Sequence, residues 1–301
     1  MNDDHEGAGA SAGETLYFEV IRPEEQTVPL VFNSPHSGRV YPPDFLAAAR
    51  LDAHEVRRSE DVFVDELFAA APACGAPLQR AFFPRAFIDV NREPYELDPR
   101  MFDGDLPAHA NTTSVRVAAG LGTIPRIVAE NMDIYEDRLP AAEAVFRIDN
   151  IYKPYHASLK GLLRETKRDF GHAILVDCHS MPGSVSAGSY RRKPDIIIGD
   201  RFGTSASRAL SYAAVSIFER MGFSTVYNKP YAGGFITEYY GRPANDVHAL
   251  QVEVSRRLYV DEETLQRRPE FPALKQALSL FIAEFALQAG EILGTPRLAA
   301  E

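Results

Sequence analysis

Short apolar segments bounded by turn residues recur along the chain and predict buried strands. The clearest is Ala173–Met181 (AILVDCHSM), an apolar run that lies between Gly171 and Pro182. Runs of this length and branched composition, with such boundaries, are typical of strands that are covered on both faces. Similar patterns predict further strands at 28–32, 82–91, 196–198, 223–227 and 250–255.

Other segments carry apolar residues at helical spacing. They predict helices at 45–51, 56–71, 139–152, 155–170, 204–221 and 271–293, with Pro154 interrupting the long pair and Thr204 capping the fifth. This order of elements, without internal repeats or a low-complexity linker, predicts one α/β domain with a mixed sheet. Residues 1–14 lack apolar periodicity, so we expect a disordered tail there and a single domain over 15–301.

The strand predicted at 173–181 becomes polar only at its carboxyl end. Side chains alternate along a strand, so Asp177 and His179 share one face while Cys178 lies on the other. Open α/β sheets bind their ligands at the carboxyl ends of the strands. His179 is therefore a candidate for a residue presented to a cleft. The alternative is an ordinary hydrogen-bonded histidine at a strand end.

A second histidine follows the strand predicted at 28–32. His36 lies in a turn-rich loop (SPHSG) and has no apolar face to pack on, and Asp61 is a nearby carboxylate in sequence. Two imidazoles and one carboxylate, with a fourth position open to water, are typical of a hydrolytic zinc site. Glu253, on the polar face of a later strand, could take the proton of that water. The sequence thus allows a mononuclear metal site, although it has no HExxH signature.

Nucleophilic catalysis fits the sequence less well. Ser186 lies in SVSAG, which lacks the first glycine of G-x-S-x-G, and no strand is predicted before it. Strand alternation points Cys178 away from His179.

Most acidic residues of the helical segment 56–71 are expected to form a solvated face.

A long irregular insertion at 93–125 is rich in proline, glycine and aspartate. Such insertions are usually functional or mobile. Its Gly120-Leu-Gly122 sequence is not a dinucleotide fingerprint, because the third glycine is absent and no strand leads into it. Arg126, directly after the insertion, could instead direct a cation toward a ligand.

Composition restricts the class of protein and of partner. The 301 residues are 45% hydrophobic and 25% charged, as in ordinary globular proteins, and the net charge of -10 argues against nucleic acid or an anionic membrane as the main partner. An anionic substrate would need a local arginine cluster. The two cysteines, without a CxxC pair, suit a reducing compartment, and the acidic amino terminus does not resemble a signal peptide. We expect a cytoplasmic protein.

The order of several motifs resembles the N-formylglutamate amidohydrolase family. The resemblance extends from about residue 28 to 262. No single motif is specific, but their number and order are. The motifs are SPHSG at 34–38, ED at 60–61, VDEL at 64–67, FIDVNR at 87–92, GLGTIPR at 120–126, YKPYH at 152–156, DCHS at 177–180, GDRFG at 199–203, GGFIT at 233–237 and QVE at 251–253.

The resemblance implies a three-layer α/β/α fold with a central mixed sheet, similar to zinc exopeptidases and other members of the phosphorylase-hydrolase-like class. It implies hydrolysis of N-formyl-L-glutamate to formate and L-glutamate, a step of histidine degradation. The alternatives are another N-acyl amino acid or a small peptide as substrate, or a non-catalytic binding protein. A monomer and a homo-oligomer are both compatible with the sequence.

The resemblance also assigns roles to particular residues. It implies one divalent ion, zinc or a similar metal, with Glu60 as an alternative to Asp61 among the ligands, and Glu253 as general base. Arg85 would polarise the scissile carbonyl. The implied ligands of the ion are His36, Asp61 and His179, and the implied substrate-binding residues are Asn91, Arg92, Arg126 and Thr237.

Overall fold

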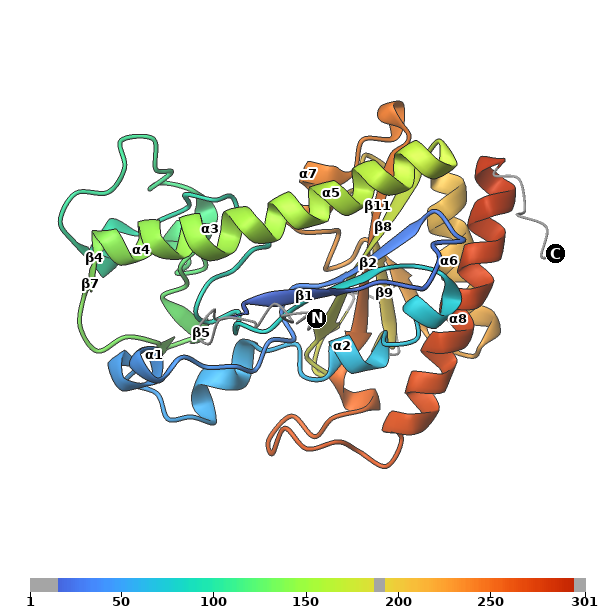
Figure 1. The fold of residues 1–301 in the computed structure, drawn as a ribbon. Coiled ribbons are helices and arrows are strands. Elements are labelled where there is room, and N and C mark those ends of the chain that lie inside the picture. The colour runs from blue at the N-terminus through green and yellow to red at the C-terminus, as the bar shows by residue number, and fades with distance from the viewer. Residues whose placement is uncertain (1–15, 187–192, 295–301) are drawn as a thin grey trace, which may run out of the picture.

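A computed structural model describes residues 16–186 and 193–294 of the chain. The tail expected at 1–14 lies outside the described residues. The described chain has three layers, with helices on both faces of a seven-stranded sheet (Figure 1). The predicted α/β/α architecture is therefore confirmed.

The central sheet is mixed. Its strand order is β1-β3-β2-β8-β11-β9-β10. The four central strands β3, β2, β8 and β11 are parallel, while β1 is antiparallel to β3, and β9 is antiparallel to β11. The strands are β1 (Phe18–Ile21), β2 (Leu30–Ser34), β3 (Leu78–Ala81), β8 (Ala173–Met181), β9 (Ile196–Gly199), β10 (Thr225–Tyr227) and β11 (Val247–Ser255).

Helices cover the two faces of this sheet separately. Leu175 of β8 packs with α5 (Lys153–Phe170) and α7 (Phe235–Tyr240) on one face. Val176, the next residue, belongs to the core on the other face with α2 (Val64–Leu67), α6 (Arg208–Arg220) and α8 (Phe271–Leu293). Successive side chains of β8 thus contact opposite helix layers, so the alternation inferred for 173–181 is confirmed.

The C-terminal helix α8 is long and apolar enough to cross a membrane by length and composition alone, and about a third of its most apolar stretch is buried. The ring of Phe281 stacks on Phe218 of α6 with the ring centroids 4.1 Å apart. In the described structure α8 is therefore a helix of the main core.

A second apolar cluster lies beside the sheet. We call residues 82–152 the insertion lobe; Figure 1 shows its helices at the far end of α5 from α8. Phe87 and Ile88 pack there with Ile148, and the buried guanidinium of Arg147 lies 3.8 Å from the centroid of the Phe87 ring. The lobe contains α3 (Val115–Ala118), α4 (Ala141–Arg147), β4 (Phe102–Asp103), β5 (Ile127–Ala129), β6 (Met132–Asp133) and β7 (Leu139–Pro140), and α1 (Pro43–Ala48) packs against it.

The strand predicted at 82–91 does not form. The strand β3 ends at Ala81, and the following residues make turns in which the Pro84 carbonyl accepts from the N–H groups of Phe87 and Ile88. Proline cannot donate to a sheet ladder, which explains why pairing stops there. The helix predicted at 56–71 is also largely wrong: only a 3-10 turn (Glu55–Ser59) and the short α2 are helical.

Three further boundaries differ from the prediction. A π-helical turn (Ile148–Tyr152) joins α4 to α5 without interruption. It lies just before Pro154, where an ordinary α-helical turn would meet the missing N–H and the ring of the proline. Ser207, not Thr204, caps α6. The edge strand β1 was not predicted.

Candidate functional site

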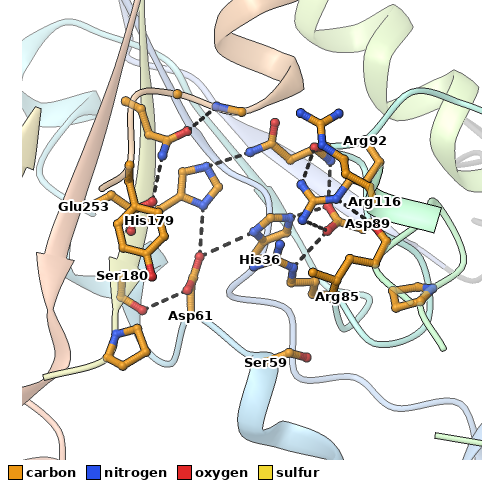
Figure 2. A pocket seen from close by; sticks show the side chains of 18 of the residues that line it. His36, Ser59, Asp61, Arg85, Asp89, Arg92, Arg116, His179, Ser180 and Glu253 are labelled. Carbon is orange, nitrogen blue, oxygen red and sulfur yellow. Dashed lines mark hydrogen bonds and ion pairs between the residues drawn. The ribbon is translucent and has the colours of Figure 1, made fainter. Parts of the chain in front are cut away.

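A cavity of about 550 Å³ opens at the carboxyl ends of β2, β8 and β11 (Figure 2). Its lining comes mainly from the strand ends, the insertion lobe and the turn at 230–234. His36, His179 and Glu253 follow or end the central strands. The facing residues come from the turns of the insertion lobe and include Arg85 and Arg92. The sheet therefore places its ligand site where open α/β sheets usually do.

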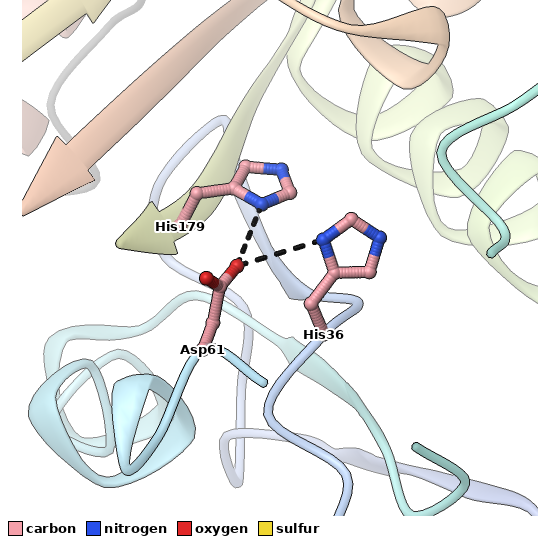
Figure 3. A group of neighbouring side chains, drawn as sticks. All are labelled: His36, Asp61 and His179. Atoms are coloured by element: carbon pink, nitrogen blue, oxygen red, sulfur yellow. Dashed lines mark hydrogen bonds and ion pairs between the residues drawn. The ribbon is translucent and has the colours of Figure 1, made fainter. Parts of the chain in front are cut away.

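Three buried side chains converge at the floor of this cavity (Figure 3). One nitrogen each of His36 and His179 and one carboxylate oxygen of Asp61 all lie within 4.8 Å of one another. The Oδ2 atom of Asp61 is 3.0 Å from Nδ1 of His179 and 3.5 Å from Nδ1 of His36. These are the residues that the resemblance implied as ligands, and the structure brings them together.

Two more carboxylates orient the imidazoles. The Nε2 atom of His36 lies 2.7 Å from Asp89, and Nε2 of His179 lies 2.9 Å from Asp177. A carboxylate partner fixes the proton on Nε2 and leaves the Nδ1 lone pair free for a cation, as in many metal sites. Burial alone would lower the pKa of His179, but Asp177 and Asp61 outweigh it and raise this pKa well above its usual range.

The Nδ1 atom of His36 is buried without a hydrogen-bond partner in the described part of the chain. Buried polar atoms are nearly always satisfied, so an unpartnered one requires an explanation. A divalent cation between the two Nδ1 atoms and Asp61 would supply it. The donor set of two nitrogens and one oxygen suits such an ion.

Asp61 is held from both sides. Its Oδ1 accepts from Ser180 Oγ at 2.9 Å and lies 3.3 Å from Nη2 of Arg256. Burial would raise the pKa of Asp61, but the neighbouring imidazoles of His179 and His36 bring it well below the usual range. The anionic form is therefore favoured at the position where a ligand to a cation is needed.

Glu60 has a different environment. Its carboxylate accepts from Arg57 Nε at 2.8 Å and from the Tyr41 hydroxyl at 3.2 Å. It does not line the cavity. Of the two acids that the sequence left as alternatives, only Asp61 faces the histidines.

Glu253 lies beside His179 in the register of β11 and β8. Burial raises the pKa of Glu253 to about 7, with Asp61 adding to the effect and His179 opposing it. The carboxylate accepts from Nε2 of Gln251 at 2.7 Å, and Oε1 of Gln251 accepts from the Gly234 N–H at 2.8 Å. A buried carboxyl with a pKa near neutrality can exchange a proton with a water in the cavity.

The insertion lobe contributes the cationic wall. Arg85 donates to Asp89 at 2.9 Å. Arg92 donates to the Leu121 carbonyl at 2.8 Å, and its Nη2 lies 3.6 Å from Asp89. Asn91 accepts from the N–H of Ile236 at 2.7 Å. The amide nitrogen of Asn91 lies 3.3 Å from Nε2 of His179.

Two predicted residues are not brought to the cavity. The Arg126 guanidinium is 2.5 Å from Asp133 and 3.5 Å from Asp98. Thr237 is fully buried beneath the Gly233 turn. Sequence reasoning missed four arginines that do line the cavity, of which only Arg256, directly after a predicted strand, had a recognisable signal. They are Arg58, Arg116, Arg201 and Arg256.

The cavity is more positive than the chain as a whole. Six arginines and three carboxylates line it, whereas the whole chain carries -10. The local arginine cluster expected for an anionic substrate is therefore present. The carboxylates are Asp61, Asp89 and Glu253.

His156 and His248 are packed residues. His156 makes hydrogen bonds at 2.8 Å to the Val90 carbonyl and at 2.9 Å to the Tyr240 hydroxyl, and burial lowers its pKa to about 4. His248 accepts from the backbone N–H of Ser207 at 3.2 Å. Because Val90 directly precedes Asn91, the bond from His156 helps to fix the backbone that carries Asn91 and Arg92.

Comparisons with known proteins show the family of the chain. A family model described as N-formylglutamate amidohydrolase matches residues 28–260. The chain is 28% identical over 248 residues to an N-formylglutamate deformylase of Pseudomonas aeruginosa, covering 81% of this chain and 87% of that protein. A deformylase of the same name from Pseudomonas putida is 28% identical over 275 residues, with 88% and 96% covered.

A solved structure is similar over nearly the whole fold. It is the crystal structure of an N-formylglutamate amidohydrolase from Ralstonia eutropha, with a TM-score of 0.84 and 34% sequence identity. The likeness covers 90% of this chain and 97% of that one. The sheet order and the strand ends that bear the candidate site therefore belong to an architecture already seen in a solved structure.

Proposed function

The chain belongs to the N-formylglutamate amidohydrolase family, and we propose that it hydrolyses the formamide bond of N-formyl-L-glutamate to give formate and L-glutamate. One observation carries the proposal. Three buried side chains that could hold a metal lie beside Glu253, whose pKa is raised to about 7, in a cavity rich in arginine. The three are His36, Asp61 and His179.

The ion would be divalent, and zinc suits the donors best. His36 Nδ1, Asp61 Oδ2 and His179 Nδ1 would hold it, with Asp89 and Asp177 orienting the two rings. When bound, such an ion lowers the pKa of a water to about 7 and polarises a carbonyl oxygen. The unpartnered Nδ1 of His36 supports the assignment.

Glu253 would move the proton. A water oxygen attacks the formyl carbon while Glu253 accepts a proton from that water, and the carbon–nitrogen bond then breaks as the proton passes to the leaving nitrogen. Arg85 is the cation proposed to stabilise the charge that develops on the formyl oxygen. Its position in the cavity beside Asp89 is consistent with that role.

Arg92 and Asn91 are proposed to bind the α-carboxylate. The Nη2 of Arg92 has no closer acidic partner than Asp89 at 3.6 Å among the described residues, so it can take a carboxylate oxygen. Arg126 and Thr237 would act indirectly, by supporting turns at Gly120 and Gly233. A small anionic N-acyl amino acid therefore suits this wall.

Two other functions are less well supported. A related amidase acting on another N-acyl amino acid or a small peptide would use the same ion and base but a different side-chain contact. A non-catalytic binding protein would have no need of a buried Glu253 next to the metal group. The cytoplasmic location, the place in histidine degradation and the oligomeric state stay predictions.

The test combines metal analysis with formate release. Purified protein is assayed with N-formylglutamate, other N-formyl amino acids and N-acetylglutamate, before and after dialysis against a chelator. We expect release of formate from N-formylglutamate, its loss on chelation and its return with zinc. Full activity in a metal-free preparation would exclude the metal mechanism, and no release from any N-formyl compound would exclude the proposed function.

A further inference from the structure

Half of the six arginines in the cavity are already bound by the protein. Arg85 donates to Asp89 at 2.9 Å, and Arg201 pairs with Glu238 at 2.7 Å. Arg256 donates to main-chain and side-chain oxygens of the segment that carries the metal group. These guanidinium groups hold the site together. The other three, Arg58, Arg92 and Arg116, have no acidic oxygen closer than 3.5 Å among the described residues, so they are the candidates to bind the two carboxylates of a substrate.

Arg116 is one of these three. It lies in the short helix α3 of the insertion lobe, and Nη1 is 3.5 Å from the buried carboxylate of Glu96. Its side chain is 32% exposed and lines the cavity. A guanidinium has five N–H donors, and no other side-chain partner is found for this one among the described residues. The Nη1 group of Arg116 is thus anchored by Glu96, while its other N–H donors can bind a ligand.

Arg92, the residue proposed to bind the α-carboxylate, is linked to the main chain of Arg116 through Leu121. The Nε of Arg92 donates to the Leu121 carbonyl at 2.8 Å, and the Leu121 N–H donates to the Arg116 carbonyl at 2.8 Å. Figure 2 shows the two side chains next to each other on the same wall.

This arrangement has an electrostatic cost. Burial lowers the pKa of Arg92, Asp89 opposes this effect, and the positive charges of Arg85 and Arg116 lower the pKa further. Like charges in a partly buried wall repel, and an anion bound between them would relieve the repulsion. The acidic neighbours do not fully cancel these two charges, because Asp89 also binds Arg85 and His36, and Glu96 lies 3.5 Å from Arg116. In a chain of net charge -10, such a pair of cations at one site indicates a selective pocket.

We propose that Arg92 and Arg116 form a two-guanidinium clamp for a dicarboxylate, in which Arg116 binds the side-chain carboxylate of the substrate. The assignment rests on the proposed function of the same site. The two carboxylates of a glutamate are separated by only three carbons, so their cations must be neighbours. A substrate with a neutral side chain would leave Arg116 without its anion.

Arg58 is the competing cation. Its guanidinium also lines the cavity and has no side-chain partner in the described part of the chain. In Figure 2 its neighbour Ser59 lies in the lower part of the view, below His36 and Arg85, whereas Arg92 and Arg116 lie at the upper right. Arg58 is therefore a matched control, because removing it deletes one positive charge from the same cavity without affecting the clamp.

The experiment compares N-formylglutamate with N-formylglutamine, its neutral isostere, in three proteins: wild type, Arg116→Gln and Arg58→Gln. A hydrogen bond to a charged group is worth about 1.5–3 kcal/mol, so wild type should prefer the acid by roughly 10–150-fold in kcat/KM. Arg116→Gln should lose this preference through slower turnover of the acid alone. Arg58→Gln should keep it.

A binding measurement separates this proposal from the proposed function. Calorimetry with glutarate and with its monoamide tests the clamp without turnover, and wild type should bind glutarate more tightly, whereas Arg116→Gln should bind both alike. If wild type releases no formate but shows this binding pattern, the clamp stands and the function falls. The reverse result, formate release with an unchanged acid preference in Arg116→Gln, overturns the clamp.

Folding is checked with a conservative variant. Arg116→Lys keeps the charge but not the planar fork, so it should retain part of the acid preference. Metal content and thermal midpoint are measured for every variant. If Arg116→Gln unfolds early, the Lys variant decides: an acid preference equal to that of wild type overturns the proposal, and a reduced one supports it. Loss of the preference in Arg58→Gln would also overturn it.

Discussion

The two walls of the cavity are built in different ways. The sheet wall, formed by His36, His179 and Glu253, takes its geometry from neighbouring parallel strands, and Glu253 lies opposite His179 in the register of β11 and β8. The insertion wall takes its geometry from turns, whose hydrogen bonds hold Arg92 and Arg116. The first is almost fully buried, whereas the second is partly exposed.

This difference separates reaction from selection. Strand register holds His179 and Glu253 at a fixed spacing, as proton transfer beside a metal requires. Apart from Arg85, which is proposed to stabilise charge in the reaction, the insertion wall needs only to present cations at a distance that matches the substrate. Changes in the sheet wall should therefore abolish turnover of every substrate, while changes at Arg92 or Arg116 should alter which substrate is preferred.

The largest effect should come from the ligands. We expect Asp61→Ala to lose both the bound ion and formate release for all N-formyl substrates, because the two imidazoles alone cannot replace the anionic donor. Glu60→Ala should retain the ion, because the Glu60 carboxylate binds Arg57 and Tyr41 instead. Metal content and formate release are measured together. Retained metal and activity in Asp61→Ala would exclude it as a ligand.

Glu253→Gln tests the sheet wall without removing the ion. The amide has nearly the same shape but cannot accept the proton, and a positioned base contributes about 10²–10⁴-fold. We expect kcat to fall by this factor while metal content and KM change little. A loss smaller than about tenfold, with the metal retained, would mean that another group is the base.

Arg92→Ala tests the insertion wall. We expect kcat/KM for N-formylglutamate to fall roughly 10–150-fold, because a charge-assisted hydrogen bond is lost. The α-amide of the substrate should be hydrolysed slowly by both proteins, so the preference for the acid disappears in the mutant. If a folded mutant keeps that preference, Arg92 is only an ion-pair partner of Asp89.

The smallest effect concerns His156, which binds the Val90 carbonyl of the insertion lobe and the Tyr240 hydroxyl of α7. Burial lowers the pKa of His156 to about 4, so at acidic pH the unfolded chain binds more protons than the folded one. Stability is therefore fully present above the unfolded pKa of about 6.5 and is lost as pH falls toward 4; between pH 7 and about 5.5 the loss should be about 1 kcal/mol. Denaturant unfolding measures it. An equal pH slope in His156→Gln would contradict the assignment.

The sheet wall was the more predictable from sequence, for a physical reason. Alternation along an apolar run is a local signal, so β8 was identified with its correct bounds and His179 was assigned to its polar end. Glu253 was found in the same way on β11. The carboxyl ends of parallel neighbours meet at one edge, so two local patterns were enough to bring both residues to one site.

The insertion wall was less predictable, because its contacts are not local. The alternation at 82–91 indicated a strand, yet these residues form turns that place Asp89 against His36 and Arg85. Arg116 and Arg126 are equally plausible in sequence. Only the acidic partners of Arg126, Asp98 and Asp133, direct it away from the cavity.

The unpartnered Nδ1 of His36 links metal binding to the free energy of unfolding of the chain. A buried polar atom without a partner costs about 1–3 kcal/mol. An ion that binds the folded chain alone removes this cost and adds a stabilisation that grows with the logarithm of its free concentration. The supply of metal would thus control the folded fraction of the protein as well as its catalytic rate. A cell short of metal would hold less folded protein, in addition to a less active form of it.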